Sequence, residues 1–375
     1  MMPQPVAAAE PAGLLARFAR PSWTPDFPES LPSNLADYLA QTSVAKLAFR
    51  RLRRLISLWL GRQFALCRAT IPVSTRRVLW LYKGTPQVGD SLMDLAGRTL
   101  LRGADFRIDL YTDPHLAKLY AGDDVFDKVL SAPEQLDSSH YDLVILHSYS
   151  SHCLREKLRL CPDVPFVPFY GYYTGPEFNR TLFSYFRVNS LLPARLSEPV
   201  LRQMAKPHLH RTAETLAQVD GLHLPKRFIA LAVGGVREWR TYTHWPAVLD
   251  QLAQRGWHLP VVLLGSDNGL SMRDQLIEQN VVVLVDQVDR LELPVVAEVL
   301  ARAELLLCAD GGLMHVANAV STPVVALLAQ FVLPELRFCA ANRATTLYAS
   351  DQVSSITPES VADAVMRALP ASFPA

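Results

Sequence analysis

Residues 305–328 read LLLCADGGLMHVANAVSTPVVALL, and this stretch contains one complete unit of the expected fold. Leu305–Cys308 and Pro323–Leu328 are short apolar runs of the kind that form buried strands. Between them, two glycines are followed by Leu313–Val320, which has helical spacing. A strand, a helix and a second strand in this order predict a βαβ unit in a parallel sheet.

The same alternation continues in both directions from this unit. Earlier strands and helices are predicted at Val78–Tyr82, Ser91–Arg102, Phe106–Tyr111, His115–Tyr120 and Tyr141–His147. Later ones are predicted at Phe228–Val233, Trp245–Arg255, Pro260–Leu264, Val281–Val285, Leu293–Ala303 and Pro358–Ala368, the last with Thr357 as its cap. The patterns predict two Rossmann-like, doubly wound α/β domains, joined near residues 200–225, with ligands at the carboxyl ends of the strands.

The first 75 residues lack this pattern. Residues 1–33 are rich in proline and are expected to form an extended arm, whereas Leu35 to about Cys67 has helical spacing. No acidic residue occurs between Ala40 and Gly89, where the basic side chains are Lys46, Arg50, Arg51, Arg53, Arg54, Arg62, Arg68, Arg76, Arg77 and Lys83. Two interpretations stay open: residues 46–77 lie on an anionic membrane surface, or the helix packs on the protein with its arginines in water.

The composition argues against several classes of protein. A net charge of +1 provides no overall field for nucleic acid, and the five cysteines fit neither a zinc pattern nor a disulfide framework, so reduced thiols in a cytoplasm are expected. We recognise no secretory signal, membrane-spanning run, P-loop, GxSxG, HExxH or GxGxxG motif. Asp123, Asp124 and Asp127 are expected to be solvated surface, so no metal or other cofactor is predicted.

The loop after the first strand, Lys83 to Asp90, is the first candidate for chemistry. Gly84 and Gly89 allow the backbone to approach a ligand closely. Asp90 is either the N-cap of the next helix or a general base that takes a proton from a hydroxyl group. Lys83 and Gln87 are candidates for binding that acceptor.

The loop within the opening stretch is the second candidate. Gly311 and Gly312 stand at the start of a helix, where free N–H groups and the helix dipole favour a pyrophosphate. Asp310 could bind sugar hydroxyls, and His315 could reach the same ligand from the first turn. Their alternative roles are a helix cap and a half-buried helix histidine.

The loop after Phe228–Val233 is the third candidate. Gly234 and Gly235 free its backbone, and Arg237 and Arg240 could form charge-assisted bonds to phosphate. The alternative is an exposed arginine loop.

Together these loops resemble glycosyltransferase family 9, the ADP-heptose:lipopolysaccharide heptosyltransferases and their relatives. The resemblance covers about residues 76–370 and rests on Gly89-Asp90-Ser91-Leu92, on Thr243-His244-Trp245-Pro246, and on Asp310-Gly311-Gly312-Leu313-Met314-His315-Val316-Ala317 followed by the strand at 323–327. It implies a GT-B fold and an inverting, metal-independent sugar transfer. It also implies Asp90 as the base and Asp310, Gly311, Gly312 and His315 as donor-binding residues.

The sequence departs from the family pattern at three points. Family members usually have a lysine at the position of Thr243, and Arg240 or Arg237 could replace it. Gly311 stands where the family has threonine or serine. In the family, an acidic residue shortly after the glycine that ends the next strand contacts the ribose. It is missing from the corresponding loop here, residues 265–269, although Asp267 could replace it in part.

The sequence therefore predicts four segments. These are an arm with a basic amphipathic helix (1–70), an acceptor domain (71–215), a nucleotide-sugar domain (216–355) and a helix that crosses back to the first domain (356–375). The predicted function is transfer of a sugar, with ADP-heptose as the favoured donor, to a lipopolysaccharide core or another cell-surface glycan or glycolipid, in the cytoplasm or at the inner membrane face. A GT-B-fold nucleotide-sugar epimerase and a non-catalytic nucleotide-sugar-binding relative are the alternatives.

Overall fold

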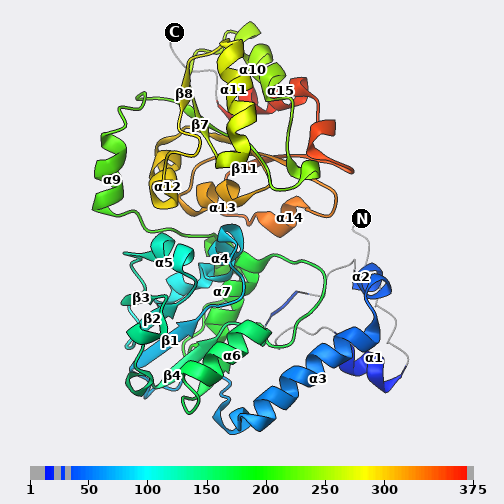
Figure 1. Cartoon of the computed structure of the whole chain (residues 1–375), viewed down its shortest axis with the longest axis vertical. Helices are drawn as coiled ribbons and strands as arrows, with labels where there is room; N and C mark the ends of the chain where they lie inside the picture. The colour runs from blue at the N-terminus through cyan, green and yellow to red at the C-terminus, as the bar shows by residue number, and fades with distance from the viewer. Residues whose placement is uncertain (1–12, 21–26, 30–34, 370–375) are drawn as a thin grey trace.

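The computed structural model describes residues 13–20, 27–29 and 35–369, and it shows two lobes stacked along the long axis of the molecule (Figure 1). Each lobe contains one parallel sheet with helices on its faces. An N-terminal extension of helices runs along the outside of the first lobe. The predicted fold class, two doubly wound α/β domains, is confirmed.

The first lobe is built on a five-stranded sheet of order β3-β2-β1-β4-β5. Its strands, all parallel, are β1 (Arg77–Leu81), β2 (Arg107–Tyr111), β3 (Lys128–Leu130), β4 (Leu143–Leu146) and β5 (Phe166–Pro168). The four residues Val78–Leu81 are completely buried, because helices cover both faces of a doubly wound sheet. The helices are α4 (Val88–Asp94), α5 (Pro114–Tyr120), α6 (Ser151–Leu160), α7 (Arg180–Leu191) and α8 (Glu198–Met204).

The second lobe is built on a six-stranded parallel sheet of order β11-β10-β9-β6-β7-β8. Its strands are β6 (Ile229–Ala232), β7 (Val261–Leu264), β8 (Leu284–Asp286), β9 (Leu306–Ala309), β10 (Val324–Ala329) and β11 (Ala344–Ala349). Its helices are α9 (Ala213–Asp220), α10 (Trp245–Gln254), α11 (Leu270–Gln279), α12 (Leu293–Arg302), α13 (Gly312–Ala319), α14 (Pro334–Arg337) and α15 (Pro358–Ala368).

The helix predicted at 91–102 is shorter than expected and begins earlier. α4 ends at Asp94 and continues as a tighter 3₁₀ segment over Ala96–Leu101. Within that segment, a Cβ on Gly97 would lie 2.4 Å from the carbonyl oxygen of Ser184 on α7. The chain therefore passes α7 at a distance that only glycine permits.

The last helix was expected to cross back to the first lobe, and this prediction is wrong. α15 packs on α10 and on the β10 and β11 edge of the second sheet (Figure 1). Its apolar face belongs to the buried cluster of the second lobe, with Val361, Ala362 and Val365 completely buried. The cap prediction is confirmed, because the Thr357 side chain accepts the amide of Ser360.

The N-terminal extension contains α1 (Leu14–Ala19), α2 (Leu35–Gln41) and α3 (Val44–Leu60). The helical segment predicted over 35 to about 67 is confirmed as far as Leu60, with a break between α2 and α3, and a 3₁₀ turn follows over Gln63–Leu66. The expected extended arm is wrong for residues 14–19, which form α1 against α3. Residues 1–12, 21–26 and 30–33 of the arm lie outside the described residues. Phe27 is buried against Phe183 of α7, with ring centroids 5.0 Å apart, and this fixes the extension to the first lobe.

Candidate active site

The loop after β9 leaves backbone N–H groups beside open space. Gly311 is the N-cap of α13 in an extended conformation, with φ of −179°. A Cβ on Gly312 would meet no atom within 4 Å. Because free amides and the positive end of the helix dipole meet there, this end of α13 can hold an anionic group such as a diphosphate.

Asp310 lies beside this site between two arginines. Its side chain is 3% exposed, Arg337 Nε donates to its Oδ1 at 3.2 Å, and Arg240 Nη1 lies 3.2 Å from its Oδ2. Gly311 occupies the cap position, so Asp310 is not the cap of α13. The two guanidinium groups bring positive charge close to the free amides.

The loop after β6 supplies the first of these arginines. Arg240 ends the 3₁₀ turn Glu238–Arg240, and its guanidinium lies over the ring of Trp239 at 4.6 Å from the centroid. Arg237 is exposed at the start of that turn. Arg240, rather than Arg237, is therefore the arginine that the structure places beside Asp310.

The other predicted donor-binding residues of this lobe contact other groups of the same lobe. A Cβ on Gly234 or Gly235 would lie 2.4 or 2.3 Å from a side-chain oxygen of a neighbouring residue, so both glycines allow close packing of the loop. Thr243 is exposed and shares a hydrogen bond with Ser354. Asp267 is also exposed, and its carboxylate accepts a neighbouring amide.

Asp90 lies in the first turn of α4, on the first lobe. Gln87 is the N-cap of that helix, so the cap alternative for Asp90 is excluded. Arg180 Nη1 lies 2.8 Å from Asp90 Oδ1, and the Asp90 side chain is 29% exposed. Burial raises the pKa of Asp90 above its usual value, and Arg180 offsets only part of this effect. A carboxylate with a raised pKa and access to solvent is suited to general base catalysis.

Arg180 also binds a second carboxylate, the completely buried Asp94. Arg180 Nε donates to Asp94 at 2.7 Å, and Asp94 also accepts from Tyr82 at 3.0 Å, His147 at 3.1 Å and Tyr170. Burial alone would raise the pKa of Asp94, but Arg180 and His147 outweigh it and hold the pKa well below its usual range. Asp94 therefore stays ionised and fixes Arg180 in place.

Gly89 and His315 bring the two lobes into contact. The helix α4 lies against α13 (Figure 1). A Cβ on Gly89 would lie 2.5 Å from Cδ2 of His315, so a larger residue at position 89 would require a shift of its neighbours. His315 is 4% exposed rather than half-buried, and burial, with Arg337 adding to it, lowers the pKa of His315 to about 4. Its imidazole is neutral at physiological pH, and Nδ1 has no hydrogen-bond partner among the described residues.

The comparison with protein families concerns α7 and the second lobe. Residues 179–349 match the model of glycosyltransferase family 9 (heptosyltransferase). The chain carries a glycosyltransferase family 9 domain. It is therefore a glycosyltransferase, and the match includes Arg180, the Arg240 loop and the Asp310 motif. No curated protein sequence matches the chain.

Solved structures of family 9 share the fold. The glycosyl transferase family 9 protein of Veillonella parvula is 17% identical with a TM-score of 0.62, and 78% of this chain covers 97% of that one. Escherichia coli ADP-heptose lps heptosyltransferase II is 17% identical with a TM-score of 0.59, covering 78% and 98% of the two chains. Escherichia coli heptosyltransferase WaaC with ADP is 17% identical with a TM-score of 0.54, covering 78% and 100%. The expected GT-B fold is confirmed.

Three residues of the candidate site were not predicted from the sequence. They are Arg180, which binds Asp90; Glu177, which accepts two hydrogen bonds from Arg337 at 2.7 and 2.9 Å; and Arg337, which also binds Asp310. Glu177 lies in the first lobe and Arg337 in the second, so this ion pair joins the lobes beside the site.

The two predicted acceptor residues differ in their surroundings. Lys83 Nζ donates to Asp113 at 2.7 Å and lies over the ring of Tyr111, so its charge is already paired. Gln87 is exposed as the N-cap of α4, three residues before Asp90.

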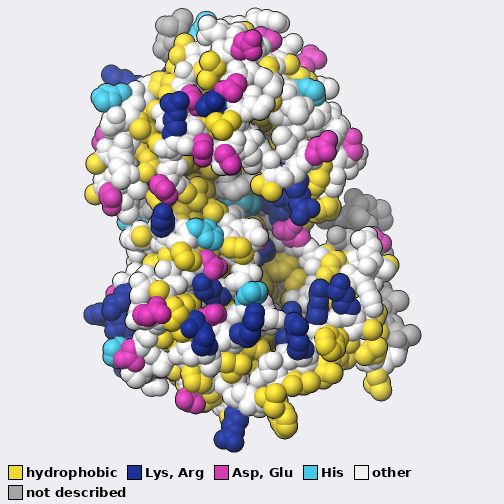
Figure 2. Space-filling model, viewed as in Figure 1, with side chains coloured by type: hydrophobic (Ala, Val, Ile, Leu, Met, Phe, Trp, Pro, Cys, Tyr) yellow, Lys and Arg dark blue, Asp and Glu magenta, His cyan; other side chains and the backbone are white. Residues whose placement is uncertain are grey.

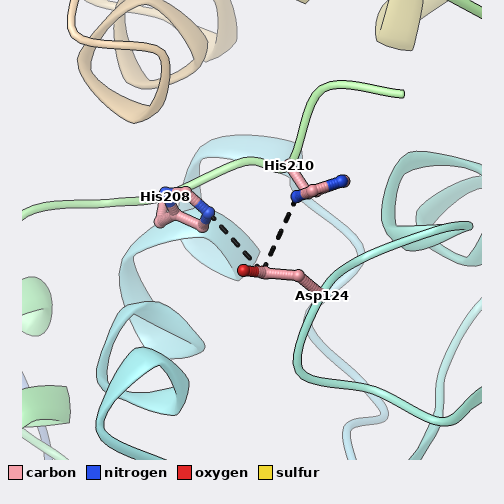
Figure 3. Close-up of side chains that lie close together, drawn as sticks. All are labelled: Asp124, His208 and His210. Carbon is pink, nitrogen blue, oxygen red and sulfur yellow. Dashed lines mark ion pairs between the residues drawn. The ribbon is translucent and has the colours of Figure 1, made fainter. Parts of the chain in front are cut away.

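One group of possible metal ligands occurs among the described residues, Asp124, His208 and His210, where the chain passes between the lobes (Figure 3). The two histidines lie 3.7 and 3.9 Å from Asp124 Oδ1. Arg102 already binds both Asp124, at 2.8 Å, and His208, at 2.7 Å, so a guanidinium supplies the positive charge there. The expectation of a solvated acidic turn is wrong for Asp123, which is buried against Arg98.

Proposed function

We propose that this glycosyltransferase moves heptose from ADP-heptose to a lipopolysaccharide core or another cell-surface glycan, with inversion and without a metal ion. The observation that carries the proposal is the contact of α4 with α13 at Gly89 and His315. Because of this contact, α4, which carries Asp90 as a carboxylate suited to act as a base, lies against α13, whose N-terminus can bind an anion. The match to the heptosyltransferase family and the similarity in fold to ADP-heptose lps heptosyltransferase II and to heptosyltransferase WaaC with ADP support the choice of donor.

In the proposed reaction, Asp90 takes the proton of an acceptor hydroxyl while that oxygen forms a bond to the anomeric carbon. The bond between this carbon and the diphosphate oxygen breaks, and its electron pair leaves with ADP. The amides of Gly311 and Gly312, the α13 dipole and Arg240 meet the negative charge that develops on the leaving group. The neutral His315 closes the space between the lobes, which limits the access of water.

Asp90→Asn tests the role of the base. The variant removes a proton acceptor but keeps the size of the side chain, so we expect kcat to fall by about 10²- to 10⁴-fold. The dissociation constant for ADP-heptose should stay close to that of the wild type, as measured by calorimetry. Asp163→Asn, at an exposed carboxylate, is the matched control. Transfer by Asp90→Asn at the wild-type rate would show that Asp90 is not the base.

A thermal-shift comparison of ADP-heptose with GDP-, UDP- and TDP-sugars tests the donor. The true donor at about a hundred times its dissociation constant should stabilise the protein by about 2.7 kcal/mol. Release of nucleotide without any acceptor, at the rate seen with acceptor, would favour an epimerase instead.

We also propose that α3 holds the enzyme at the cytoplasmic face of the inner membrane, where a glycolipid acceptor would lie. One side of α3 exposes an apolar stripe, Phe49, Leu52, Ile56, Trp59 and Leu60, of which Phe49 is 63% and Trp59 69% exposed. Figure 2 shows apolar and basic side chains side by side along the lower right edge, where α3 runs in Figure 1. No helix in the described part of the chain is long and apolar enough to span a bilayer.

Sedimentation with vesicles tests the α3 surface. Phe49→Ser/Trp59→Ser should lose binding to vesicles of phosphatidylglycerol and phosphatidylethanolamine, because it removes the two most exposed aromatic rings of the stripe. Val236→Ser/Val283→Ser, at exposed valines of the second lobe, is the control. Equal sedimentation of all three proteins would contradict the proposal.

A further inference from the structure

A cavity of about 1040 Å³ lies beside the proposed active site, between α2, the loop before α7 and the 330–340 segment of the second lobe. Its volume is at the upper end of the range for ligand sites, roughly 300–1,000 Å³. Figure 2 shows the surface hollowed between the two lobes.

The cavity shares a wall with the active site. Glu177 lines the cavity and binds Arg337, which binds Asp310. Asn179 also lines it, donates to the carbonyl groups of α14 and the following residue Phe338, and directly precedes Arg180. Gln330 and Phe331 line it at the carboxyl end of β10, the edge of the sheet where ligands of doubly wound folds bind.

The charge of the cavity wall is negative. Four carboxylates line it, Glu29, Asp37, Glu177 and Glu335, against a single cation, Arg202. Arg202 binds Glu29 at 3.0 Å, and Glu177 is paired with Arg337. Asp37 and Glu335 are exposed and form no ion pair with any described residue, so two negative charges are uncompensated.

Aromatic rings form the apolar part of the wall. They are Tyr38, Phe178, Phe331 and Phe338. Aromatic faces attract ammonium groups, and the amides of Gln41 and Gln330 can bind hydroxyl groups. Uncompensated carboxylates beside aromatic rings favour a cationic ligand and repel a phosphorylated or carboxylated one.

We infer that this cavity binds the acceptor saccharide and selects an amino sugar, rather than a sugar that carries phosphate or carboxylate groups. The inference rests on the proposed glycosyltransfer, because it assigns the cavity to the acceptor of that reaction. It also gives the N-terminal extension a role in substrate binding, since Asp37, Tyr38 and Gln41 belong to α2.

Calorimetry with three defined trisaccharides tests the inference on the full-length protein. The probes are a glucosamine trimer, an N-acetylglucosamine trimer and a galacturonic acid trimer, at a pH where the amines are protonated. We expect the glucosamine trimer to bind most tightly and the galacturonic acid trimer most weakly. In Asp37→Asn/Glu335→Gln, the preference for glucosamine should fall by roughly threefold to tenfold, because two exposed charges are lost. Glu278→Gln/Glu359→Gln removes two exposed charges from α11 and α15 and is the control.

The outcomes separate this inference from the proposed function. Equal or tighter binding of the galacturonic acid trimer, no binding of any trimer, or an unchanged preference in Asp37→Asn/Glu335→Gln would overturn the amino-sugar assignment. ADP-heptose binding is measured on the same proteins. If the wild type does not bind ADP-heptose, the proposed donor is refuted. The trisaccharide preference still tests the amino-sugar assignment separately.

Discussion

Replacing Arg180 with methionine should move the pH dependence of transfer and weaken the first lobe. Arg180 Nη1 lies 2.8 Å from Asp90, and Arg180 Nε donates to the buried Asp94 at 2.7 Å. Methionine keeps much of the side-chain length but removes the positive charge from both carboxylates. Two consequences follow, one for each carboxylate.

The first consequence concerns Asp90. A cation 2.8 Å from a carboxyl group lowers its pKa by about one to three pH units, so removal of Arg180 should raise the pKa of Asp90 by that amount. Because a general base must be deprotonated, the acid limb of kcat/KM should move to higher pH by the same one to three pH units.

The second consequence concerns Asp94, whose pKa is held below its usual range in the folded protein. Such a group stabilises the fold at pH values above its unfolded pKa, about 3.9, and this contribution is lost as the pH falls through the folded value. Without Arg180 the buried charge loses its partner, so the free energy of unfolding at neutral pH should fall by roughly 3–5 kcal/mol.

The assays are ADP release as a function of pH and urea unfolding at neutral pH. Arg180→Lys keeps a positive charge but lacks the fork that binds two carboxylates, so we expect an intermediate acid limb and intermediate stability. An acid limb of Arg180→Met that stays in place or moves to lower pH would refute the assignment of Asp90 as a base tuned by Arg180.

Three further predictions follow from the contact between the lobes and from the arginines. His315 has a pKa of about 4 in the fold against 6.5 normally, so stability should be full above pH 6.5 and fall by roughly 3 kcal/mol on acidification to pH 4; His315→Asn should flatten this slope in urea unfolding. Gly89→Ala should lower both stability, by about 1–3 kcal/mol, and kcat, because its methyl group meets His315, and His315→Ala should restore them in part. Arg240→Ala should weaken ADP-heptose binding by at least about tenfold in calorimetry, and Arg237→Ala, at an exposed arginine without an ion pair in the described part of the chain, should weaken it less.

Most strands of the two sheets could be predicted from the sequence. Runs of four or more apolar residues, such as those of β1 and β10, are recognisable because both faces of these strands are buried. The strands β3 and β5 have only three residues each, and β11 is half-buried, so none has a pattern that distinguishes it from a loop. The packing of the last helix was also beyond the sequence, since an apolar helix face does not identify the lobe that it packs on.

The site was predictable in part for a similar reason. Asp90, Asp310 and the glycines stand next to strands in recognisable motifs, so their loops could be located from local spacing. Arg180 reaches Asp94 across 86 positions and Arg337 reaches Glu177 across 160. No periodicity links residues so far apart, and the polar groups that hold the site together are therefore visible only in the folded chain.

The contact between Gly89 and His315 has a consequence for how the enzyme protects its donor. Gly89, next to the proposed base, contacts the other lobe, so the distance between the base and the diphosphate site depends on how closely the lobes meet. If the lobes part to admit the nucleotide sugar, Asp90 keeps its contact with Arg180 but moves away from the helix that binds the diphosphate, during the interval when water can enter. Hydrolysis of the activated sugar is then slow in the open form, in which the sugar is most exposed to water.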